Sequence, residues 1–304
     1  MTAGTQGTVE TYTCSNCGAT TSFDPSSRTL RCPFCGTAMA VRATAAAVNL
    51  TVEQFVLPFK LQKNDSEEQI RHWLGNSFWA PGDLKNRSSL DLGQGIYVPF
   101  WRFDADAFSH WEGEISKTHT RQVQKTRTGS DGKPEQYSTT ESYKTWHPRS
   151  GTHEGSHRAW IPGSTGLTRA EGDELMPFPE EAMMTYSPDI LVGFSAEDPG
   201  IDQDGAWVQG EQRIREGERD ACAREVERLT RADTTLSNRR SAVCYLPVWI
   251  YTYAYEQAQF RVLVNGHTGE VVGDRPVSKM RVGIAVGAGA VLLVMILALY
   301  LLFS

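Results

Sequence analysis

The sequence predicts an α+β protein in which a small N-terminal cysteine module precedes a β-rich body and a C-terminal hydrophobic helix. Three observations predict this organisation. Four regularly spaced cysteines lie near the N-terminus, an aromatic strand motif occurs twice in the body, and a long uncharged segment lies at the C-terminus. The 304 residues are sufficient for one large or two modest domains beside the cysteine module.

The cysteine module contains two C-x2-C pairs, formed by Cys14, Cys17, Cys32 and Cys35. Each pair places two thiolates on one side of a metal ion, so that two facing pairs complete a closed tetrahedral zinc site. A glycine follows each pair, and glycine adopts the positive φ that a turn around a metal requires. The sequence therefore predicts one structural zinc ion in a zinc ribbon, with disulfides or redox-active pairs as the alternative.

After the ribbon, residues 43–52 are rich in alanine and lack aromatic side chains, which is typical of a linker. The apolar run Phe55–Leu61 then indicates a strand. Ser66 and Gln69 fit a capping box, so we expect a helix to begin there. The apolar face of this helix would consist of Ile70, Trp73, Leu74 and Phe78.

The body contains a repeated motif, Y-x-P-x-W-x-aromatic, which starts at Tyr97 and again at Tyr245. Aromatic and small apolar residues alternate after each copy with a period of two, which is the spacing of a half-buried strand. We expect each copy to begin a strand in one of two related β-rich lobes. Large aromatic residues usually serve packing, so Trp101 and Trp249 are predicted to be core residues.

Two hairpins are expected in the body. The glycine-rich segment 265–269 separates two apolar runs and predicts a short hairpin. The polar segment Glu114–Trp146, with a turn at 130–133, predicts a long hairpin that extends from the sheet. Residues 117–144 contain six Lys or Arg and three Asp or Glu, an excess that is more typical of a solvated edge than of a nucleic-acid site.

Residues 200–211 partly match a calcium-binding loop, but Gly200 stands where the first carboxylate is required, so we do not predict calcium there. Asp202 is instead expected to cap a helix. The apolar stripe of this helix would consist of Trp207, Ile214, Ala221, Cys222, Val226 and Leu229. Cys222 and the strand residue Cys244 are predicted to be buried thiols.

A second metal site would need the histidines of the pattern H-x5-H-x3-H, which are His147, His153 and His157, beside Glu154. The surrounding proline, serine and glycine residues indicate a flexible strand or loop. The sequence therefore favours the ribbon cysteines as the only metal ligands.

The C-terminal segment Val282–Phe303 contains no charged residue. An α-helix rises about 1.5 Å per residue, so a helix of this length just spans a hydrocarbon core of roughly 30 Å. Buried helices of soluble proteins seldom run this far without a polar face. We therefore predict a single transmembrane anchor.

Arg275, Lys279 and Arg281 precede the predicted span, and the positive-inside rule places the N-terminal bulk of the chain in the cytoplasm. A reducing compartment also suits thiolate ligands. Within the span, Gly283 and Gly287 form a G-x3-G step that would let two copies pair as a homo-oligomer.

These predictions divide the chain into a zinc ribbon at 1–42, a linker at 43–52, a cytoplasmic β-rich body at 53–278 and an anchor at 279–304. The net charge of −6 gives no general attraction to nucleic acid or anionic lipid. The sequence contains no phosphate-binding loop, nucleophile elbow or zinc-protease helix, which lowers the expectation of an enzyme.

Several short segments are shared with a known family: Cys-Pro-Phe-Cys-Gly at 32–36, Leu57-Pro58-Phe59-Lys60, Phe78-Trp79-Ala80-Pro81, the segment 95–101, Leu191-Val192-Gly193-Phe194 and the segment 264–270. On these segments, nearly the whole chain resembles a family of bacterial membrane proteins with a TFIIB-type zinc ribbon, sometimes labelled as similar to primosomal helicases. Its C-terminal hairpin also resembles a PepSY-type hairpin. The resemblance implies an inner-membrane protein, in some genomes linked to phage-shock-type and SPFH/flotillin-like membrane proteins.

We therefore expect a non-enzymatic, single-pass adaptor of the inner membrane, held by residues 282–303, which recruits or scaffolds protein partners at the cytoplasmic face. The alternative is a membrane-tethered nucleic-acid-binding protein that uses the zinc ribbon. Residues 1–50 carry a net charge of only about +1, whereas useful phosphate binding usually requires several cations on one face.

Overall fold

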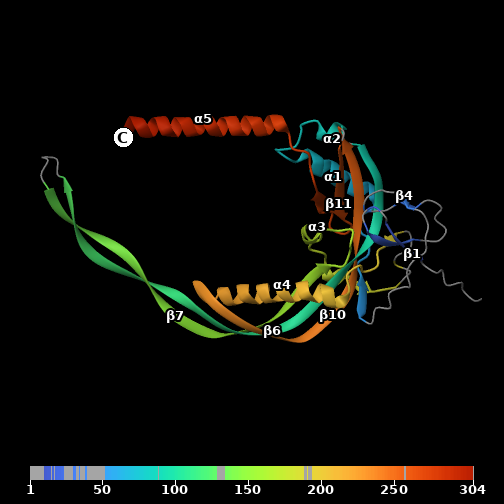
Figure 1. Ribbon diagram of the computed structural model, residues 1–304, viewed down its shortest axis with the longest axis horizontal. Coiled ribbons are helices and arrows are strands. Elements are labelled where there is room, and N and C mark those ends of the chain that lie inside the picture. Colours follow the sequence, from blue (N-terminus) through green and yellow to red (C-terminus); the bar gives the residue numbers. More distant parts are fainter. Residues whose placement is uncertain are drawn as a thin grey trace, which may run out of the picture. The chain divides into compact units, whose positions relative to one another are not determined.

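The structure is a computed structural model of the 304-residue chain (Figure 1). It describes residues 10–14, 16, 18–23, 30–31, 34, 38–39, 52–87, 89–128, 134–187, 190, 194–256 and 258–303, with some side chains in these ranges, among them 297–299 and 301–303, left undescribed. The predicted linker at 43–52 lies outside the described residues except for Val52.

The fold is α+β, as predicted, and is built on a mixed sheet of ten strands among the described residues. Strands β1, β2, β9, β6, β10, β11 and β12 are neighbours in that order, β7 pairs with β6, and β5 pairs with β10 and β8. The β5–β10 and β6–β9 pairs are parallel. The strands are β1 Glu10–Thr13, β2 Thr20–Phe23, β5 Glu53–Val56, β6 Ser89–Thr128, β7 Pro134–Pro162, β8 Met184–Thr185, β9 Ser195–Ala196, β10 Arg228–Tyr255, β11 Ala258–Asn265 and β12 Val271–Gly273, and β3 Leu30–Arg31 pairs separately with β4 Ala38–Met39.

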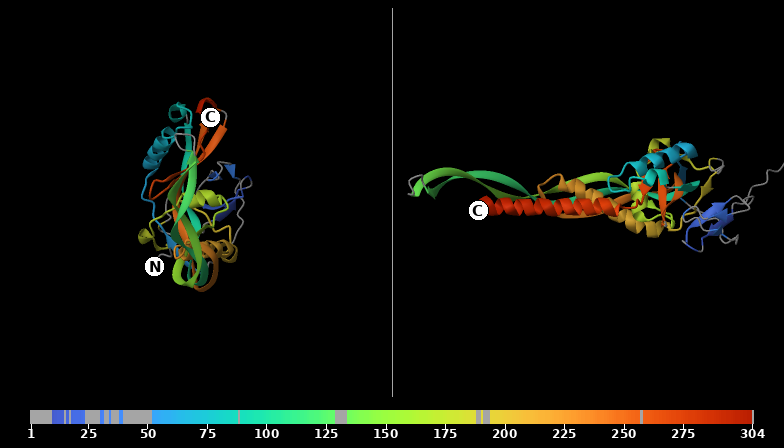
Figure 2. Two further views of the ribbon diagram at one scale, coloured as in Figure 1. Left: turned by 90° about the vertical axis from the view of Figure 1, so that its left-hand side faces the viewer. Right: turned by 90° about the horizontal axis from the view of Figure 1, so that it is seen from above.

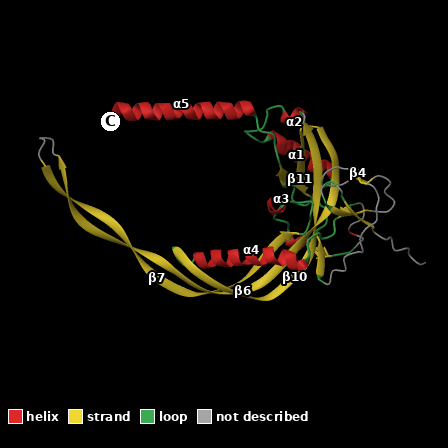
Figure 3. Cartoon of the chain, viewed as in Figure 1, coloured by secondary structure: helices red, strands yellow, loops and turns green. Residues whose placement is uncertain are grey.

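The helices are α1 Lys63–Gly75, α2 Leu84–Arg87, α3 Arg169–Glu174, α4 Gln203–Ala223 and α5 Lys279–Phe303, with a short 3₁₀ helix at Glu180–Ala182 (Figure 3). The chain divides into two compact units, to which β6, β7 and β10 each contribute. Unit 1 comprises Met1–Trp101, Ile161–Ala206 and Ala242–Ser304, and unit 2 comprises Arg102–Trp160 and Trp207–Ser241.

The two copies of the repeated motif lie on the neighbouring strands β6 and β10, so they belong to one sheet and do not open two separate lobes. The second copy lies in unit 1, whereas the first passes from unit 1 into unit 2 after Trp101. They also lie within these strands, which begin at Ser89 and Arg228, and not at the strand starts that the sequence predicted. The predicted core tryptophans are buried. Trp101 Nε1 donates to the Ile201 carbonyl at 2.8 Å and Trp249 Nε1 to the Leu61 carbonyl at 3.1 Å.

Helix α1 begins three residues before the predicted capping box. Gln62 is the N-cap residue, and its backbone amide donates to Oδ2 of Asp65 at 3.1 Å in a capping box. Ser66 is instead buried inside the helix and bonds the hydroxyl of Tyr251. The predicted apolar face joins the unit 1 core through Ile70, Trp73 and Leu74, whereas Phe78 lies beyond the helix and is 73% exposed.

The glycine-rich segment forms the predicted hairpin between β11 and β12. The Asn265 Oδ1 atom accepts hydrogen bonds from the backbone of His267 and Thr268, at 2.9 and 3.0 Å. Gly269 has a φ of +85°, which favours glycine.

Unit 2 contains the outer part of the predicted long hairpin, formed by β6 and β7 (Figure 2), together with part of β10 and helix α4. Asp202 accepts a hydrogen bond from the Gly205 amide at 2.8 Å, which confirms the predicted cap of α4. Helix α4 packs on the strands. A Cβ at Gly210 would contact the ring of Phe103, and the Arg213 guanidinium donates to the Trp160 carbonyl at 2.7 Å.

The predicted membrane anchor at 279–304 falls on α5. Among the residues that the structure describes, no helix is long and apolar enough to cross a membrane.

Candidate functional site

The predicted zinc ribbon is described only in part. Its strands form two hairpins, β1–β2 and β3–β4, and a C-x2-C segment connects the strands of each. Cys14 is buried at the end of β1, where its amide donates to the Ala19 carbonyl and its carbonyl accepts from the Gly18 amide. Gly18 has the expected positive φ, at +75°. The other predicted ligands, Cys17, Cys32 and Cys35, lie outside the described residues.

A cluster of metal-binding side chains lies in unit 2, between β7 and α4. His153 and His157 extend from β7 toward Glu218 of α4. The Nδ1 atom of His153 lies 3.0 and 3.1 Å from the two carboxylate oxygens, and Nε2 of His157 lies 2.6 Å from Oε2. Cys222, one helical turn after Glu218, places its Sγ atom 3.8 Å from Oε1. Donor atoms of His153, Glu218 and Cys222 all lie within 4.8 Å of one another.

Local geometry explains why these side chains meet. Successive residues of a strand alternate between its faces, so His153 and His157 share one face of β7 with Gly155 between them. A Cβ at Gly155 would lie 3.3 Å from Cε1 of His153, 3.4 Å from Nε2 of His157 and 3.6 Å from Oε2 of Glu218. Because Gly155 has no side chain, the imidazoles of His153 and His157 can both approach Glu218 beside it. On α4, Gly217 makes similar room for the ring of His157.

The centre of this cluster is inaccessible to solvent, whereas its edge is not. Glu218 and Cys222 are fully buried, and the side chains of His153 and His157 are 26% and 19% exposed. Burial acts to raise the pKa of Glu218, but hydrogen bonds from His157, Ser109 and His153 outweigh it and hold the pKa below its ordinary value. The carboxylate is thus an anion held by hydrogen bonds.

The pattern of histidines in the sequence is compatible with a second metal site, but the surrounding residues led us to favour the ribbon cysteines as the only ligands. Of the flexible strand or loop that the sequence indicated, the structure shows a strand, since the segment belongs to β7. His147 does not join the cluster, since its Nε2 atom bonds Thr145 at 3.0 Å, and Glu154 is exposed. Glu218 was not identified as a site residue. The only signal was its four-residue spacing from Cys222 on a predicted helix, which puts both on one face.

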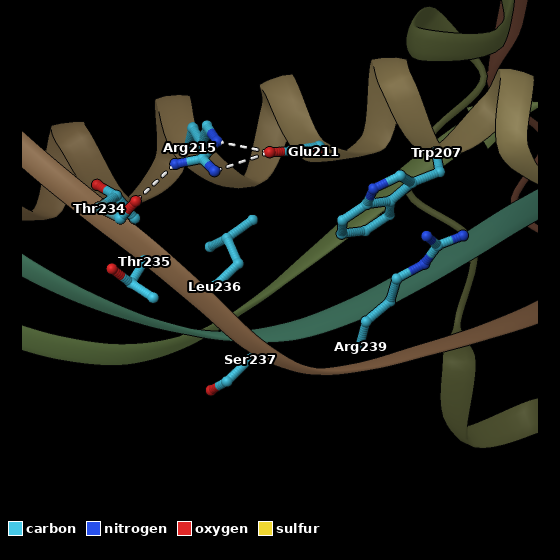
Figure 4. Close-up of a pocket in the computed structure, with 8 residues that line it drawn as sticks. All are labelled: Trp207, Glu211, Arg215, Thr234, Thr235, Leu236, Ser237 and Arg239. Carbon is cyan, nitrogen blue, oxygen red and sulfur yellow. Dashed lines mark hydrogen bonds and ion pairs between the residues drawn. The ribbon is translucent and has the colours of Figure 1, made fainter.

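Elsewhere in unit 2, a groove lies between α4 and β10 (Figure 4). Two of its charged side chains already have partners in the protein: Arg215 pairs with Glu211 at 2.8 Å and donates to the Thr234 carbonyl at 2.7 Å. The guanidinium of Arg239 lies 4.2 Å from the centre of the Trp207 ring. These contacts serve packing between helix and strand, and we assign no ligand to the groove.

Comparison with known proteins yields one relative. Uncharacterized protein YdjG of Bacillus subtilis (strain 168) is 25% identical to this chain over 236 residues. The matched region covers 75% of this chain and 64% of the relative, so the chain spans less than two thirds of the relative's length. No family model matches the chain, and no solved structure matches it.

Proposed function

We propose that the protein is a non-enzymatic adaptor attached to the inner membrane, where a zinc ribbon and the β-rich body bind protein partners at the cytoplasmic face. The observation that carries this proposal is a continuous set of exposed apolar side chains on α5 and at its base. On α5 they include Ile284, Val286, Val291, Leu292, Leu293, Val294, Met295, Ile296 and Tyr300, each at least half exposed.

Further exposed apolar residues surround the start of α5, and we call Phe78, Trp79, Val277 and Met280 the collar. They are 73%, 47%, 59% and 72% exposed, respectively. Isolated exposed apolar residues are common, but a contiguous set next to an apolar helix indicates contact with a membrane or a partner. Tryptophan beside basic residues is typical of the membrane–water interface.

Hydrogen bonds fix the collar to the helix. The Arg281 guanidinium donates to the Phe78 carbonyl at 2.6 Å, and the Ser278 amide donates to the Trp79 carbonyl at 2.8 Å. The Arg275 guanidinium lies 3.7 Å from the centre of the Trp73 ring. These contacts place cationic groups beside the apolar collar, which suits anionic headgroups above a hydrocarbon layer.

The proposal of insertion, as opposed to surface attachment, rests on the full uncharged run of the sequence and not on the described part of α5 alone. In the sequence the uncharged run continues to Phe303, through positions whose side chains the structure leaves undescribed. Basic residues on its N-terminal side favour a cytoplasmic body. A Cβ at Gly283 or Gly287 would have no neighbour within 4 Å, so this face of α5 is open to a second copy.

The zinc ribbon would lie against the rest of unit 1, on the evidence of two contacts. Ser22 of β2 pairs with Ala196 of β9, which joins the ribbon to the main sheet. Phe34, between the second pair of cysteines, is buried and packs on Gly166 of the body. Cys14 is buried and Gly18 has a positive φ, as expected for a turn around a metal ion. Both features suit a single structural zinc ion bound by the four cysteines.

Nucleic-acid binding is less favoured because several cations of the long hairpin are paired with carboxylates. Lys125 and Arg121 both pair with Glu141, at 2.9 and 3.3 Å, and Arg127 pairs with Glu135 at 3.0 Å. Cations that are already paired release few counterions from a phosphate backbone.

Membrane attachment can be tested by lipid crosslinking and by extraction. With benzoylphenylalanine in place of Phe78, we expect crosslinks to lipid in native membranes, and none with the same group in place of Tyr143, an exposed aromatic residue of the hairpin. The full chain should resist alkaline extraction, and a chain ending at Arg281 should be released. The proposal of membrane attachment would be wrong if alkaline treatment released the full chain and position 78 gave no crosslinks to lipid.

The adaptor role needs a second experiment. Crosslinking of the tagged full-length chain in native membranes, followed by mass spectrometry, should identify protein partners that are lost in the Cys32→Ser, Cys35→Ser variant. Capture of the same proteins by both forms would show that the ribbon is not the docking surface.

A further inference from the structure

We infer that unit 2 contains a second metal site, in which His153, Glu218 and Cys222 bind a divalent transition-metal ion of the zinc class, and His157 orients the Glu218 carboxylate. The inference is independent of the proposed adaptor function. It rests on the donor set and on the spacing of the donors.

The donor set matches zinc chemistry. Zinc in proteins is bound by histidine nitrogen, cysteine sulfur and carboxylate oxygen, whereas calcium and magnesium prefer oxygen alone. The cluster offers one donor of each kind from His153, Cys222 and Glu218. Three protein ligands leave the fourth position of a tetrahedral ion for a water molecule.

The spacing of the donors also fits. Zinc–nitrogen and zinc–oxygen bonds of about 2.0 Å in a tetrahedron separate two ligand atoms by about 3.3 Å, and a zinc–sulfur bond of about 2.3 Å separates sulfur and oxygen by about 3.5 Å. In the protein, Nδ1 of His153 lies 3.0 and 3.1 Å from the Glu218 oxygens, and Sγ of Cys222 lies 3.8 Å from Oε1. The donor atoms of His153 and Cys222 lie within 4.8 Å of each other, so side-chain shifts of up to about 1 Å would bring all three donors to the spacing of about 3.3 to 3.5 Å.

His157 has a different role because its Nε2 atom lies 2.6 Å from Oε2 of Glu218, closer than two ligands of one ion would approach. It is placed as a donor to the carboxylate, and such partners of a metal ligand fix its orientation and strengthen binding. The carboxyl oxygen that faces Cys222 stays available for the ion.

The alternative is that His153 and His157 only neutralise the buried Glu218 carboxylate as cations. This explains the two imidazoles, because buried charges are paired. It does not account for the fully buried thiol of Cys222 placed 3.8 Å from the Glu218 carboxylate. Partial exposure of His153 gives an ion a route into the cluster.

Metal analysis of the full-length chain in mild detergent tests the inference. We expect His153→Ala to contain one zinc ion per chain fewer than the unchanged protein, whatever the occupancy of the ribbon. Cys222→Ser and Glu218→Gln, which nearly conserve volume, should lose the same ion. His147→Ala is the matched control on the same strand and should keep it, since this residue lies outside the cluster.

Chelator competition distinguishes the role of His157, which orients a ligand, from the role of the three ligands themselves. His157→Ala should keep the ion but bind it about 10- to 100-fold more weakly, as expected for a residue that acts through a ligand. Equal zinc content in the unchanged protein and in folded His153→Ala would overturn the inference and leave an ion pair.

If the variants fail to fold, the unchanged protein provides the measurement. Added zinc should slow amide hydrogen exchange in the second half of α4 and around Gly155 of β7. Equal exchange in these two segments with and without zinc would contradict the site.

Discussion

The buried carboxyl of Glu197 predicts an unusual dependence of stability on pH. Glu197 in unit 1 is fully buried. Its Oε1 atom accepts from the Thr165 amide at 3.1 Å, and Oε2 has no hydrogen-bond partner among the described residues. Burial outweighs these hydrogen bonds and raises the pKa of Glu197 from 4.5 to about 8.

The sign of the effect follows from proton binding. The folded protein keeps a proton on Glu197 that the unfolded chain releases above about pH 4.5, so the stability from this group is complete below that pH and is lost as the pH rises toward 8. Each pH unit in this window changes the free energy of unfolding by about 1.4 kcal/mol. Between pH 6 and pH 8 the loss attributable to Glu197 is therefore roughly 2 to 3 kcal/mol.

The perturbation is Glu197→Gln, which keeps the shape of the side chain and removes the titration. Urea unfolding of the full chain in mild detergent at pH 6 and pH 8 measures the free energy of unfolding. We expect the unchanged protein to lose roughly 2 to 3 kcal/mol more than the variant over this range. Glu68→Gln, at an exposed position of α1, should retain the full loss. Identical losses in the unchanged protein and Glu197→Gln would refute the reasoning.

Three further predictions concern packing and capping. Trp101→Ala should lower the free energy of unfolding by about 3 to 5 kcal/mol in urea titrations, because it empties a fully buried site; a loss below about 1 kcal/mol would contradict this packing. Asp202→Ala should cost about 1 kcal/mol through loss of the α4 cap, and Asp220→Ala, exposed on the same helix, should cost less than about 0.5; equal losses would argue against the cap. Gly166→Val should displace Phe34, since a Cβ there would lie 2.3 Å from its ring, and should speed proteolysis within residues 1–42; an unchanged cleavage rate would show that the ribbon is not held there.

Features that depend on neighbouring residues could be predicted from the sequence. The cap at Asp202 and the hairpin at 265–269 are confirmed, because each is specified by side-chain to backbone contacts within a few positions. The predicted start of α1 was wrong for a related reason. Gln62 and Asp65 form the cap, and the apparent capping residue Ser66 is taken into the core by Tyr251, a partner far along the chain.

The repeated aromatic motif illustrates a different limit. Its period of two correctly predicted strands with buried tryptophans, but period alone does not state where a strand begins or which strand lies beside it. Pairing of β6 with β10 placed both copies in one sheet. The likeness of the two segments therefore reflects two strands in similar surroundings and not two lobes.

By itself, the sequence determined the α+β class, the long polar hairpin, the cap of α4 and the two C-x2-C pairs, because spacing along the chain is sufficient to specify each of them. Only the tertiary structure decided that His153 and His157 meet Glu218, 61 to 65 residues farther along, with Cys222 beside it. That meeting depends on how α4 packs against β7 and on the space that Gly155 leaves. Contacts between a strand and a distant helix are set by packing, and the periodicity of either segment does not predict them.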